Sequence, residues 1–329
     1  MIYKERSKPI RLMMLEALTR RLSQNHPMRS RVEEDCARQL AGYKGELAAQ
    51  YFIDQLPAKT LVLYDLRIPA DTQGNRFFQI DTLALTPGYA LVMEVKNISG
   101  QLLFEPRYDQ LIRKKKDGSE EVFPDPINQV RRQSQQLKDC FAYNKLPPLP
   151  IENLVVVANP YAKITVSSSD SRDHAAVIRY TAITSRMTEY AGQFRRNVLS
   201  QKQLEQVAAT LLQIHTPNKN PILPVYQLLP SDLMTGVQCS ACKSFDIVKK
   251  GRGWLCHKCL VREDSAGLLA LIDYALLINK KATKKDLREF LRFTSKSSLQ
   301  KWLKSLGLQY EGHSTKLVYN LCLELLLSK

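Results

Sequence analysis

One stretch of the sequence combines an apolar strand pattern with two charged residues. Residues 90–97 read ALVMEVKN, so Glu94 and Lys96 follow four apolar residues and stand two positions apart. A charged pair at the end of an apolar strand is costly to bury unless the charges are paired or take part in chemistry. The preceding strand-like run, residues 77–85, reads FFQIDTLAL and contributes a third charged residue, Asp81.

The turn between the two runs predicts how these residues meet. A Pro-Gly pair separates the runs and is a turn signal. With that pair at the centre of a hairpin turn, Asp81 lies opposite Glu94, and Gln79 lies opposite Lys96. Side chains alternate along a strand, so all four point to the same face. A slip of one residue would move Asp81 to the other face.

Two facing carboxylates repel each other unless a cation lies between them. The oxygens of Asp81 and Glu94 suit Mg²⁺ or Mn²⁺, which also bind phosphate oxygens. Lys96 can orient a water molecule or offset charge that develops in a transition state. This combination predicts phosphodiester hydrolysis. The alternative is a structural ion pair.

The elements around this hairpin predict one mixed α/β domain that ends near residue 215. A helix over residues 30–56 precedes the strands, with Gly42 and Gly45 predicting a break in it. The elements expected after it are strands at 60–68, 77–85 and 89–97, a polar hairpin with arms at 110–114 and 120–124, a helix at 125–144, strands at 153–158 and 175–180, and two helices within 185–214.

An aspartate followed by an ExK pair, within the order helix, three strands, helix, strand, resembles the PD-(D/E)xK nuclease superfamily. More closely, GYKGELAAQYFIDQLP, LVLYDLRIP, FFQIDTLALTPGYALVMEVKNISGQLLFE and FPDPINQVRRQSQQL resemble the nuclease-related domain, NERD, over roughly residues 35–165. The resemblance implies a restriction-endonuclease-like mixed sheet flanked by helices. It also implies a Mg²⁺-dependent nuclease site formed by Glu46, Asp81, Glu94, Lys96 and Gln129.

The charge balance points to a polyanionic partner. The 329 residues carry 48 Lys and Arg against 32 Asp and Glu, a net charge of +16. Nucleic acid is favoured as the partner over an anionic membrane surface, and the alternative is a basic protein with no polyanionic partner. In the function predicted from the whole sequence, the nucleic acid is DNA. One basic run lies beside the polar hairpin turn and is expected to hold a nucleic-acid backbone, unless it is a solubilising loop: Arg113, Lys114, Lys115 and Lys116.

Membrane and export signals are not found in the sequence. No apolar run approaches the length of a bilayer span. The first residues lack the continuous apolar core of a signal peptide, and instead Leu12, Leu15, Leu18 and Leu22 share one face of a helix. Together with the cysteine usage, this predicts a cytoplasmic protein.

Four of the seven cysteines have the spacing of a metal site. Cys239 and Cys242 form one CxxC pair, and Cys256 and Cys259 form another thirteen residues later. Four thiolates at this spacing predict a zinc ribbon that needs Zn²⁺ to fold, with His257 as a bystander. The ribbon either serves only to stabilise the fold, or it also contacts nucleic acid through Lys249, Lys250, Arg252 and Trp254.

The last segment predicts a helix-turn-helix, or alternatively a helical protein-interaction module. Thr283 and Asp286 form a capping pair for the first helix of the motif. On the second helix, Lys296, Lys301 and Lys304 lie away from the apolar stripe and are expected to contact phosphates. A small wing is expected with its tip at residues 311–314.

The predicted organisation has five segments: an amphipathic helical segment at 1–34, the NERD domain at 35–215, a linker at 216–234, the zinc ribbon at 235–263 and a winged-helix-like module at 264–329. The predicted function is a Mg²⁺-dependent nuclease held on nucleic acid by the two small modules. Two rival functions are a non-catalytic DNA-binding protein that uses the nuclease-like fold as a grip, and an enzyme directed at RNA.

Overall fold

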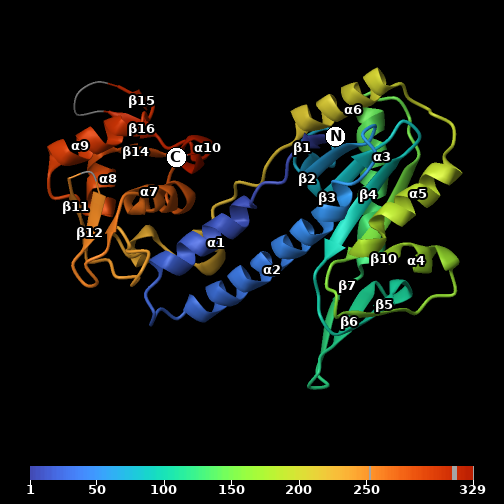
Figure 1. Ribbon diagram of the computed structural model, residues 1–329, viewed down its shortest axis with the longest axis horizontal. Helices are drawn as coiled ribbons and strands as arrows, with labels where there is room; N and C mark the ends of the chain where they lie inside the picture. Colours follow the sequence, from blue (N-terminus) through green and yellow to red (C-terminus); the bar gives the residue numbers. More distant parts are fainter. Residues whose placement is uncertain (252, 313–316, 329) are drawn as a thin grey trace. The chain divides into compact units, whose positions relative to one another are not determined.

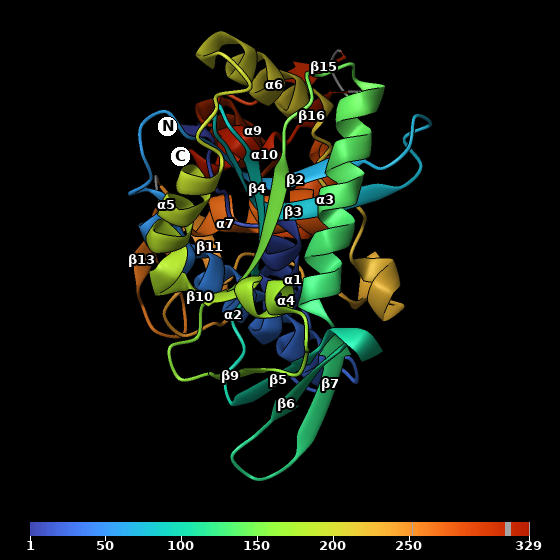
Figure 2. The same ribbon diagram turned by 90° about the vertical axis from the view of Figure 1, so that its right-hand side faces the viewer.

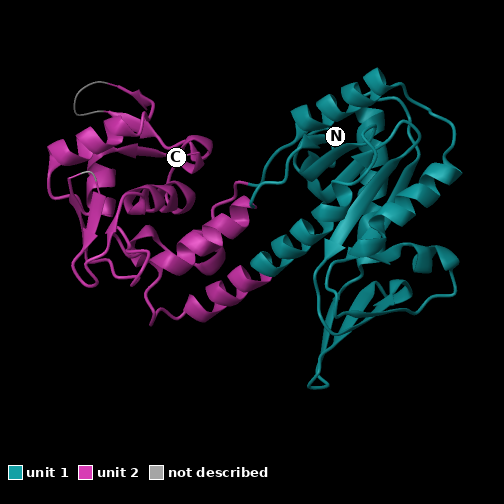
Figure 3. Ribbon diagram, in the orientation of Figure 1, with its two compact units in different colours: residues 1–8, 39–218 teal, residues 9–38, 219–329 magenta. Residues whose placement is uncertain are grey.

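A computed structural model describes residues 1–251, 253–312 and 317–328. Two predictions fall at least partly outside the described residues: the nucleic-acid contact of Arg252, and residues 313 and 314 of the wing tip expected at 311–314. The chain divides into two compact units (Figure 3). Unit 1 contains Met1–Lys8 and Gln39–Asn218, and unit 2 contains Pro9–Arg38 and Lys219–Lys329.

Unit 1 is built on a six-stranded mixed sheet in the order β1-β2-β3-β4-β8-β10 (Figure 1). The strands are β1 (Ile2–Lys4), β2 (Leu61–Pro69), β3 (Phe77–Leu85), β4 (Ala90–Lys96), β8 (Ile151–Val157) and β10 (Val177–Arg179). The pairs β2–β3 and β3–β4 are antiparallel, whereas β1, β8 and β10 each run parallel to a neighbour. Five of these strands were expected, and the edge strand β1 was not.

Helices cover both faces of this sheet, as the predicted fold class requires. On one face α3 (Pro126–Tyr143) and α6 (Gln201–Ile214) bury residues such as Leu137 and Leu204 against the strands. On the other face α2 (Arg29–Ile53) and α5 (Ile183–Gln193) contribute residues such as Ile53 and Met187. A short helix, α4 (Ser171–Ala175), precedes β10. This is the mixed α/β architecture that the sequence predicted.

A second, four-stranded sheet follows β4 in unit 1, in the order β7-β6-β5-β9 (Figure 2). Its strands are β5 (Gln101–Glu105), β6 (Gln110–Lys114), β7 (Glu120–Pro124) and β9 (Lys163–Val166). The polar hairpin of β6 and β7 has the residues expected from the sequence. The other two strands of this sheet, β5 and β9, were not predicted.

The register of the β3–β4 hairpin agrees with the prediction. Thr82 pairs with Met93 and Leu85 with Ala90, and the backbone N–H of Thr86 donates to the carbonyl of the residue after the Pro-Gly pair. The recorded ladder ends at the Thr82 pair, one residue before Asp81. Neither Asp81 with Glu94 nor Gln79 with Lys96 is paired in this ladder, so both of these expected pairings are wrong.

Helix α2 runs without interruption through both glycines, so the expected break at Gly42 and Gly45 is wrong. Gly45 instead marks a close approach to the end of β4, because a Cβ atom there would lie 2.4 Å from Asn97 Cβ. The Asn97 side chain donates to the carbonyl of Ala41 on the same helix at 2.8 Å. The small residue therefore lets α2 pack closely beside the predicted site.

Unit 2 contains one shared hydrophobic core rather than separate small modules. Its helices are α1 (Ile10–Arg21), α7 (Ala266–Leu277), α8 (Lys284–Leu291), α9 (Lys296–Ser305) and α10 (Leu323–Leu327). Its strands are β11 (Ile247–Lys250), β12 (Gly253–Cys256), β13 (Arg262–Glu263), β14 (Lys281–Thr283), β15 (Tyr310–Glu311) and β16 (Val318–Asn320). One cluster of buried residues joins all the helices to the cysteine segment.

The N-terminal helix α1 supplies part of this core. Leu15 and Leu18 are buried in it, as the apolar face of the helix predicted. Arg21, which is 1% exposed, donates to the equally buried Asp273 of α7, with 2.8 Å between Nε and Oδ2. The structure thus divides residues 1–34 between the units, because β1 joins the sheet of unit 1 and α1 joins the core of unit 2.

No helix among the described residues has the length and apolarity needed to cross a membrane.

Candidate functional site

Three of the five predicted site residues are directly connected. The Lys96 ammonium donates to Glu94 on the same strand, with 2.7 Å between Nζ and Oε1. It also donates to Gln129 Oε1 on α3 at 3.0 Å. The Glu94 side chain is 6% exposed and that of Lys96 is 24% exposed, so the carboxylate lies in the core and the ammonium at its edge.

Gln133, which the sequence prediction missed, completes the environment of Glu94. It lies one helical turn after Gln129, is buried, and donates from Nε2 to Glu94 Oε2 at 2.9 Å. Each carboxylate oxygen of Glu94 therefore accepts a hydrogen bond. The sequence contains a signal for this role, since Gln133 interrupts an apolar stripe that includes Val130 and Leu137. A polar residue at a core position requires a partner.

Asp81, on β3, lies next to the ExK pair. Its Oδ2 accepts a hydrogen bond at 2.9 Å from the backbone N–H of Val95, the residue between Glu94 and Lys96. Burial, followed by the carboxylates of Glu94 and Glu46, raises the pKa of Asp81 well above its usual range. The three carboxylates are thus close enough to disfavour one another's charge.

Glu46, on α2, is paired with Arg6, which the sequence prediction did not include. The Arg6 side chain is 1% exposed, donates to Thr82 Oγ1 at 3.0 Å, and lies over the Tyr64 ring at 4.4 Å from its centroid. Arg6 follows β1 by two residues, so the parallel edge strand carries this cation to the site. No local motif in the sequence announces that contact.

The pKa of Glu46 reflects these surroundings. Burial has the largest effect and raises the pKa of Glu46, Arg6 opposes it, and the charges of Asp65 and Glu94 add to the rise, which together bring the pKa to about 7. Glu46 is therefore a group that exchanges protons near neutral pH.

Asp65 is a fourth carboxylate in this region and was not predicted. It has a φ of 49°, and the regular pairing of β2 with β3 skips it opposite Asp81. Positive φ is uncommon for a residue other than glycine, although aspartate adopts it more readily than most. The Asp65 side chain accepts from Gln79 at 2.6 Å, so Gln79 is engaged on β2 rather than with Lys96.

The donor set of this cluster fits a hard divalent cation, since its carboxylates disfavour one another's charge and offer oxygen ligands. Within the described ranges, no three carboxylates have oxygens that all lie within 4.8 Å of one another. The sulfur atoms of Cys239, Cys242, Cys256 and Cys259 do lie that close together. In this arrangement the side chains of Lys96 and Arg6 compensate Glu94 and Glu46. A cation at Asp81 and Glu94 stays a prediction.

The basic run at the polar hairpin divides into two pairs. Arg113 donates to the Ser99 carbonyl at 2.8 Å and to Glu121 at 3.0 Å, and Lys115 lies 2.5 Å from the same glutamate. These two side chains therefore brace the hairpin. Lys114 and Lys116 are exposed.

The four cysteines form a compact cluster in unit 2. Cys239 and Cys259 lie 3.6 Å apart and Cys242 and Cys256 3.5 Å apart, measured between sulfur atoms. A tetrahedron of sulfurs around Zn²⁺ has edges of about 3.8 Å, given Zn–S bonds of about 2.3 Å. The cluster therefore fits the predicted zinc ribbon, and the antiparallel strands β11, β12 and β13 carry it. His257 is outside the cluster and lies 3.1 Å from Asp246.

Trp254 of the ribbon is buried, which contradicts the alternative in which its side chain contacts nucleic acid. Its ring lies edge-on to Phe293 at 5.3 Å and to Trp302 of α9 at 5.8 Å between centroids. A Cβ atom on Gly267 would lie 2.3 Å from the indole, so glycine is required there. Trp254 thus joins the ribbon to the helices.

The last segment has the order α7, β14, α8, α9, β15, β16, and β14, β16 and β15 form one antiparallel sheet. Thr283 and Asp286 form the predicted capping box of α8. Lys296, Lys301 and Lys304 are exposed on α9, while Trp302 and Leu303 are buried. The contact of the three lysines with phosphates stays a prediction.

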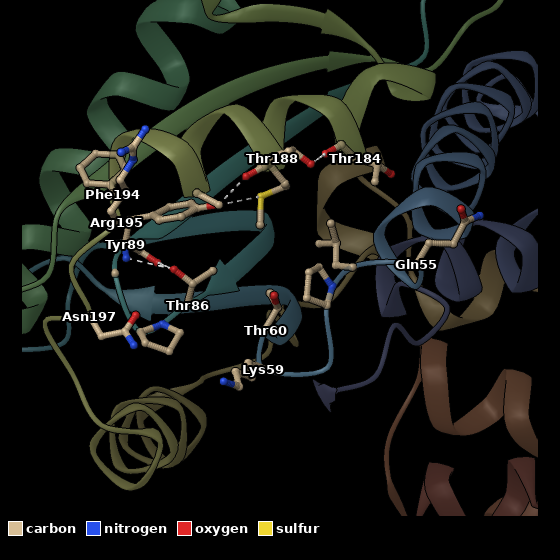
Figure 4. Close-up of a pocket in the computed structure, with 16 residues that line it drawn as sticks. Gln55, Lys59, Thr60, Thr86, Tyr89, Thr184, Thr188, Phe194, Arg195 and Asn197 are labelled. Carbon is tan, nitrogen blue, oxygen red and sulfur yellow. Dashed lines mark hydrogen bonds between the residues drawn. The ribbon is translucent and has the colours of Figure 1, made fainter.

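A pocket of about 510 Å³ opens in unit 1 beside the turn of the β3–β4 hairpin (Figure 4). Tyr89, Phe194, Lys59 and Arg195 are among the residues that line it. None of the predicted site residues lines it. The pocket is therefore separate from the Glu94–Lys96 cluster.

Comparison with known families places the site in a recognised domain. Residues 41–158 match the family model of NERD, the nuclease-related domain. That range contains Glu46, Asp81, Glu94, Lys96 and Gln129, and also Gln133. No curated protein and no solved structure was found to match the chain.

Proposed function

We propose that this chain, which carries a nuclease-related domain over residues 41–158, is a metal-dependent nuclease that hydrolyses phosphodiester bonds of nucleic acid, with DNA as the favoured substrate. The observation that carries the proposal is the position of the Lys96 ammonium. The ammonium donates to Glu94 at 2.7 Å and to Gln129 at 3.0 Å. Asp81 lies close by, because its carboxylate accepts a hydrogen bond from the backbone N–H of Val95, the residue before Lys96.

The roles follow from the chemistry of each group. Asp81 and Glu94 would hold Mg²⁺ or Mn²⁺, which when bound polarises a phosphate and lowers the pKa of a coordinated water. Lys96 would orient the attacking water or offset the charge that develops on the phosphate oxygens. Gln129 and Gln133 keep the Lys96 and Glu94 side chains in position through the hydrogen bonds that they make to them.

Glu46 is assigned a proton-transfer or metal-binding role, because its pKa of about 7 allows either form near neutral pH. Burial raises that pKa, and Arg6 lowers it and orients the carboxylate through their ion pair. Outside the NERD domain, α9 and the zinc-bound cysteine segment are proposed to hold the protein on nucleic acid.

The proposal is tested by incubating purified protein with end-labelled DNA and RNA of equal length, with Mg²⁺, with Mn²⁺ and with a chelator. Cleavage of DNA that requires the metal and is lost in Lys96→Ala supports it. Preferential cleavage of RNA would show that RNA, and not DNA, is the substrate. No cleavage of either nucleic acid by a folded, metal-loaded protein would refute the enzymatic proposal.

A second function has a specific observation in its favour. Lys96 and Arg6 already compensate the carboxylates, and no three carboxylates in the described part of the chain converge as metal ligands. A protein that grips nucleic acid without cutting it fits that arrangement. It would bind DNA with the same affinity in the presence and absence of Mg²⁺.

A further inference from the structure

Tyr161 is a large aromatic side chain that the fold leaves open to solvent. It is 87% exposed and lies in the short loop between β8 and β9. Single exposed apolar residues are common on protein surfaces. Tyr161 differs from such residues in how firmly its loop is held and in what lies beside it.

The backbone on both sides of Tyr161 is pinned by side chains. Arg179 donates to the carbonyls of Pro160 and Ala162, at 3.3 and 2.5 Å. The N–H of Tyr161 itself donates to Asn159 Oδ1 at 3.0 Å. An aromatic ring on a braced loop loses little conformational freedom when it binds a flat partner.

The same loop is tied to the strand that carries the proposed catalytic lysine. Val157 is the residue of β8 that pairs with Lys96, and the N–H of Ala158 donates to the Lys96 carbonyl at 2.9 Å. Asn159 then donates to Asn97 Oδ1 at 3.2 Å. Tyr161 therefore follows Asn159 by two residues, and Asn159 contacts Asn97, the residue directly after Lys96.

Two exposed lysines lie on strands of the second sheet: Lys163 begins β9, which directly follows the loop, and Lys114 ends β6. Gln101 of β5 pairs with Lys114 of β6 and with Lys163 of β9, so the three side chains form one row on one face of the second sheet. All three are exposed. Gly100 permits the close approach of β5 and β6, because it has a φ of 103° and a Cβ atom there would lie 2.7 Å from the Lys114 carbonyl oxygen.

We propose that Tyr161 stacks on an unpaired base of the substrate next to the Lys96 site, while Lys163 and Lys114 contact phosphates of the same strand. The inference rests on the proposed nuclease function and names its substrate class: nucleic acid with unpaired nucleotides, in preference to a blunt, fully paired duplex. Aromatic stacking accepts any base, and lysine contacts follow the backbone, so this surface selects strand state rather than sequence.

Stacking at position 161 can be measured through the fluorescence of a Tyr161→Trp variant. The two native tryptophans, Trp254 and Trp302, are both buried, so an exposed indole at position 161 gives a separable emission. Adding single-stranded oligo(dT) to this variant in the Lys96→Ala background should quench that emission, and a blunt hairpin duplex of equal nucleotide content should not. Equal quenching by both, or none by either, would overturn the proposal.

Affinity provides the second measurement. Tyr161→Ala should weaken binding of oligo(dT) roughly 5- to 150-fold, the range expected for loss of one stacked base, and Tyr161→Phe should retain wild-type affinity. Tyr143 is the matched control: it is 56% exposed and ends α3, about 21 Å along the helix from Gln129. Tyr143→Ala should leave affinity unchanged, and a Tyr161→Ala protein within twofold of wild type would contradict the inference.

The lysine row is tested by changing Lys114 and Lys163 together to Ala, with Lys138 and Lys202 as exposed controls. The log–log salt dependence of oligo(dT) affinity should decrease by about 1.4, which is 0.7 per contact for a single strand. An unchanged slope would show that Lys114 and Lys163 do not contact the phosphates of the bound strand. Cleavage is measured separately on the wild type, so a protein that fails to cut yet shows the Tyr161 effects refutes the nuclease function and not the stacking.

Discussion

Lys96 is held by partners from two elements, Glu94 on its own strand and Gln129 on α3. Such a bridge has a catalytic interpretation and a structural one. In the first, the ammonium acts on the attacking water or the transition state, and in the second it only neutralises a buried carboxylate. The two interpretations predict different results for the same substitution.

Lys96→Ala is expected to reduce cleavage by about 10²–10³-fold, the usual effect of losing one electrostatic contact to a transition state. Binding of DNA should change little, because the contribution of Lys96 is greatest in the transition state. Single-turnover cleavage and equilibrium binding measure the two effects. If the pair is only structural, the variant should instead lose about 3–5 kcal/mol of stability, as breaking a buried pair does.

Glu46 predicts a pH dependence of stability. Its pKa is raised from 4.5 to about 7 in the folded protein. Between these values the folded protein keeps a proton that the unfolded chain has released, so stability falls as pH rises from about 4.5 to about 7. Glu46→Gln should remove this slope, and its stability relative to the wild type should increase across that window.

Urea denaturation at several pH values without divalent metal measures this effect. Glu34→Gln, an exposed change near the start of α2, is the control and should follow the wild type. A stability difference between Glu46→Gln and the wild type that stays constant from pH 5 to pH 8 would show that the carboxylate titrates normally.

Among the elements of unit 2, the cysteine segment and helix α9 are joined through Trp254. Its ring contacts Phe293 and Trp302, both outside the ribbon. Loss of the ribbon structure should therefore expose aromatic residues of the helical core. This coupling makes the metal measurable through fluorescence.

We expect one zinc per chain, and removal by a chelator should shift tryptophan emission to longer wavelength. The physical reason is that four thiolates without a cation cannot stay clustered, and the segment has little core of its own. Cys259→Ser should lose the zinc, whereas Cys322→Ser, outside the cluster, should retain it. Elemental analysis that finds no zinc in protein purified without chelator would contradict this prediction.

Helix α9 exposes Lys296, Lys301 and Lys304. Changing all three to Ala should weaken binding of duplex DNA and reduce its log–log salt slope by about 2.7, or 0.9 per phosphate contact. Lys59, Lys138 and Lys202, exposed in unit 1, provide a control of equal charge change. Full affinity with an unchanged slope would favour the interpretation of α9 as part of a protein-interaction module.

At the scale of the whole molecule, residues from the beginning of the chain are part of both units. Met1–Lys8 adds β1 and Arg6 to unit 1, and α1 lies in the core of unit 2. The buried Arg21–Asp273 pair holds α1 to α7, and Arg21 also donates to the carbonyl of Gly236 at 2.6 Å. Neither unit is therefore a continuous segment of sequence.

Asp273→Asn should destabilise unit 2 by about 3–5 kcal/mol, because it leaves the Arg21 charge buried without its counter-charge. Both tryptophans belong to unit 2, so urea unfolding followed by their fluorescence reports on that unit alone. Asp264→Asn, at an exposed position, is the control and should unfold like the wild type. A transition unchanged in Asp273→Asn would show that packing, and not the ion pair, holds α1.

The sequence by itself determined the parts of this protein that depend on neighbours along the chain. The turn signal and strand alternation led to the observed register at Thr82 and Met93, which brings Asp81 beside the ExK pair. The spacing of the CxxC pairs likewise predicted the cysteine cluster. Turn chemistry and side-chain alternation act over a few residues, so they can be read without knowing the fold.

Only the tertiary structure decided the contacts between distant segments. Arg6 reaches Glu46 across forty positions because β1 joins the sheet beside β2, and a three-residue strand has too little pattern to be recognised. Trp254 is buried because the ribbon packs on α9, which its own segment does not indicate. Such contacts depend on which faces of already formed elements meet, and packing determines that choice rather than local propensity.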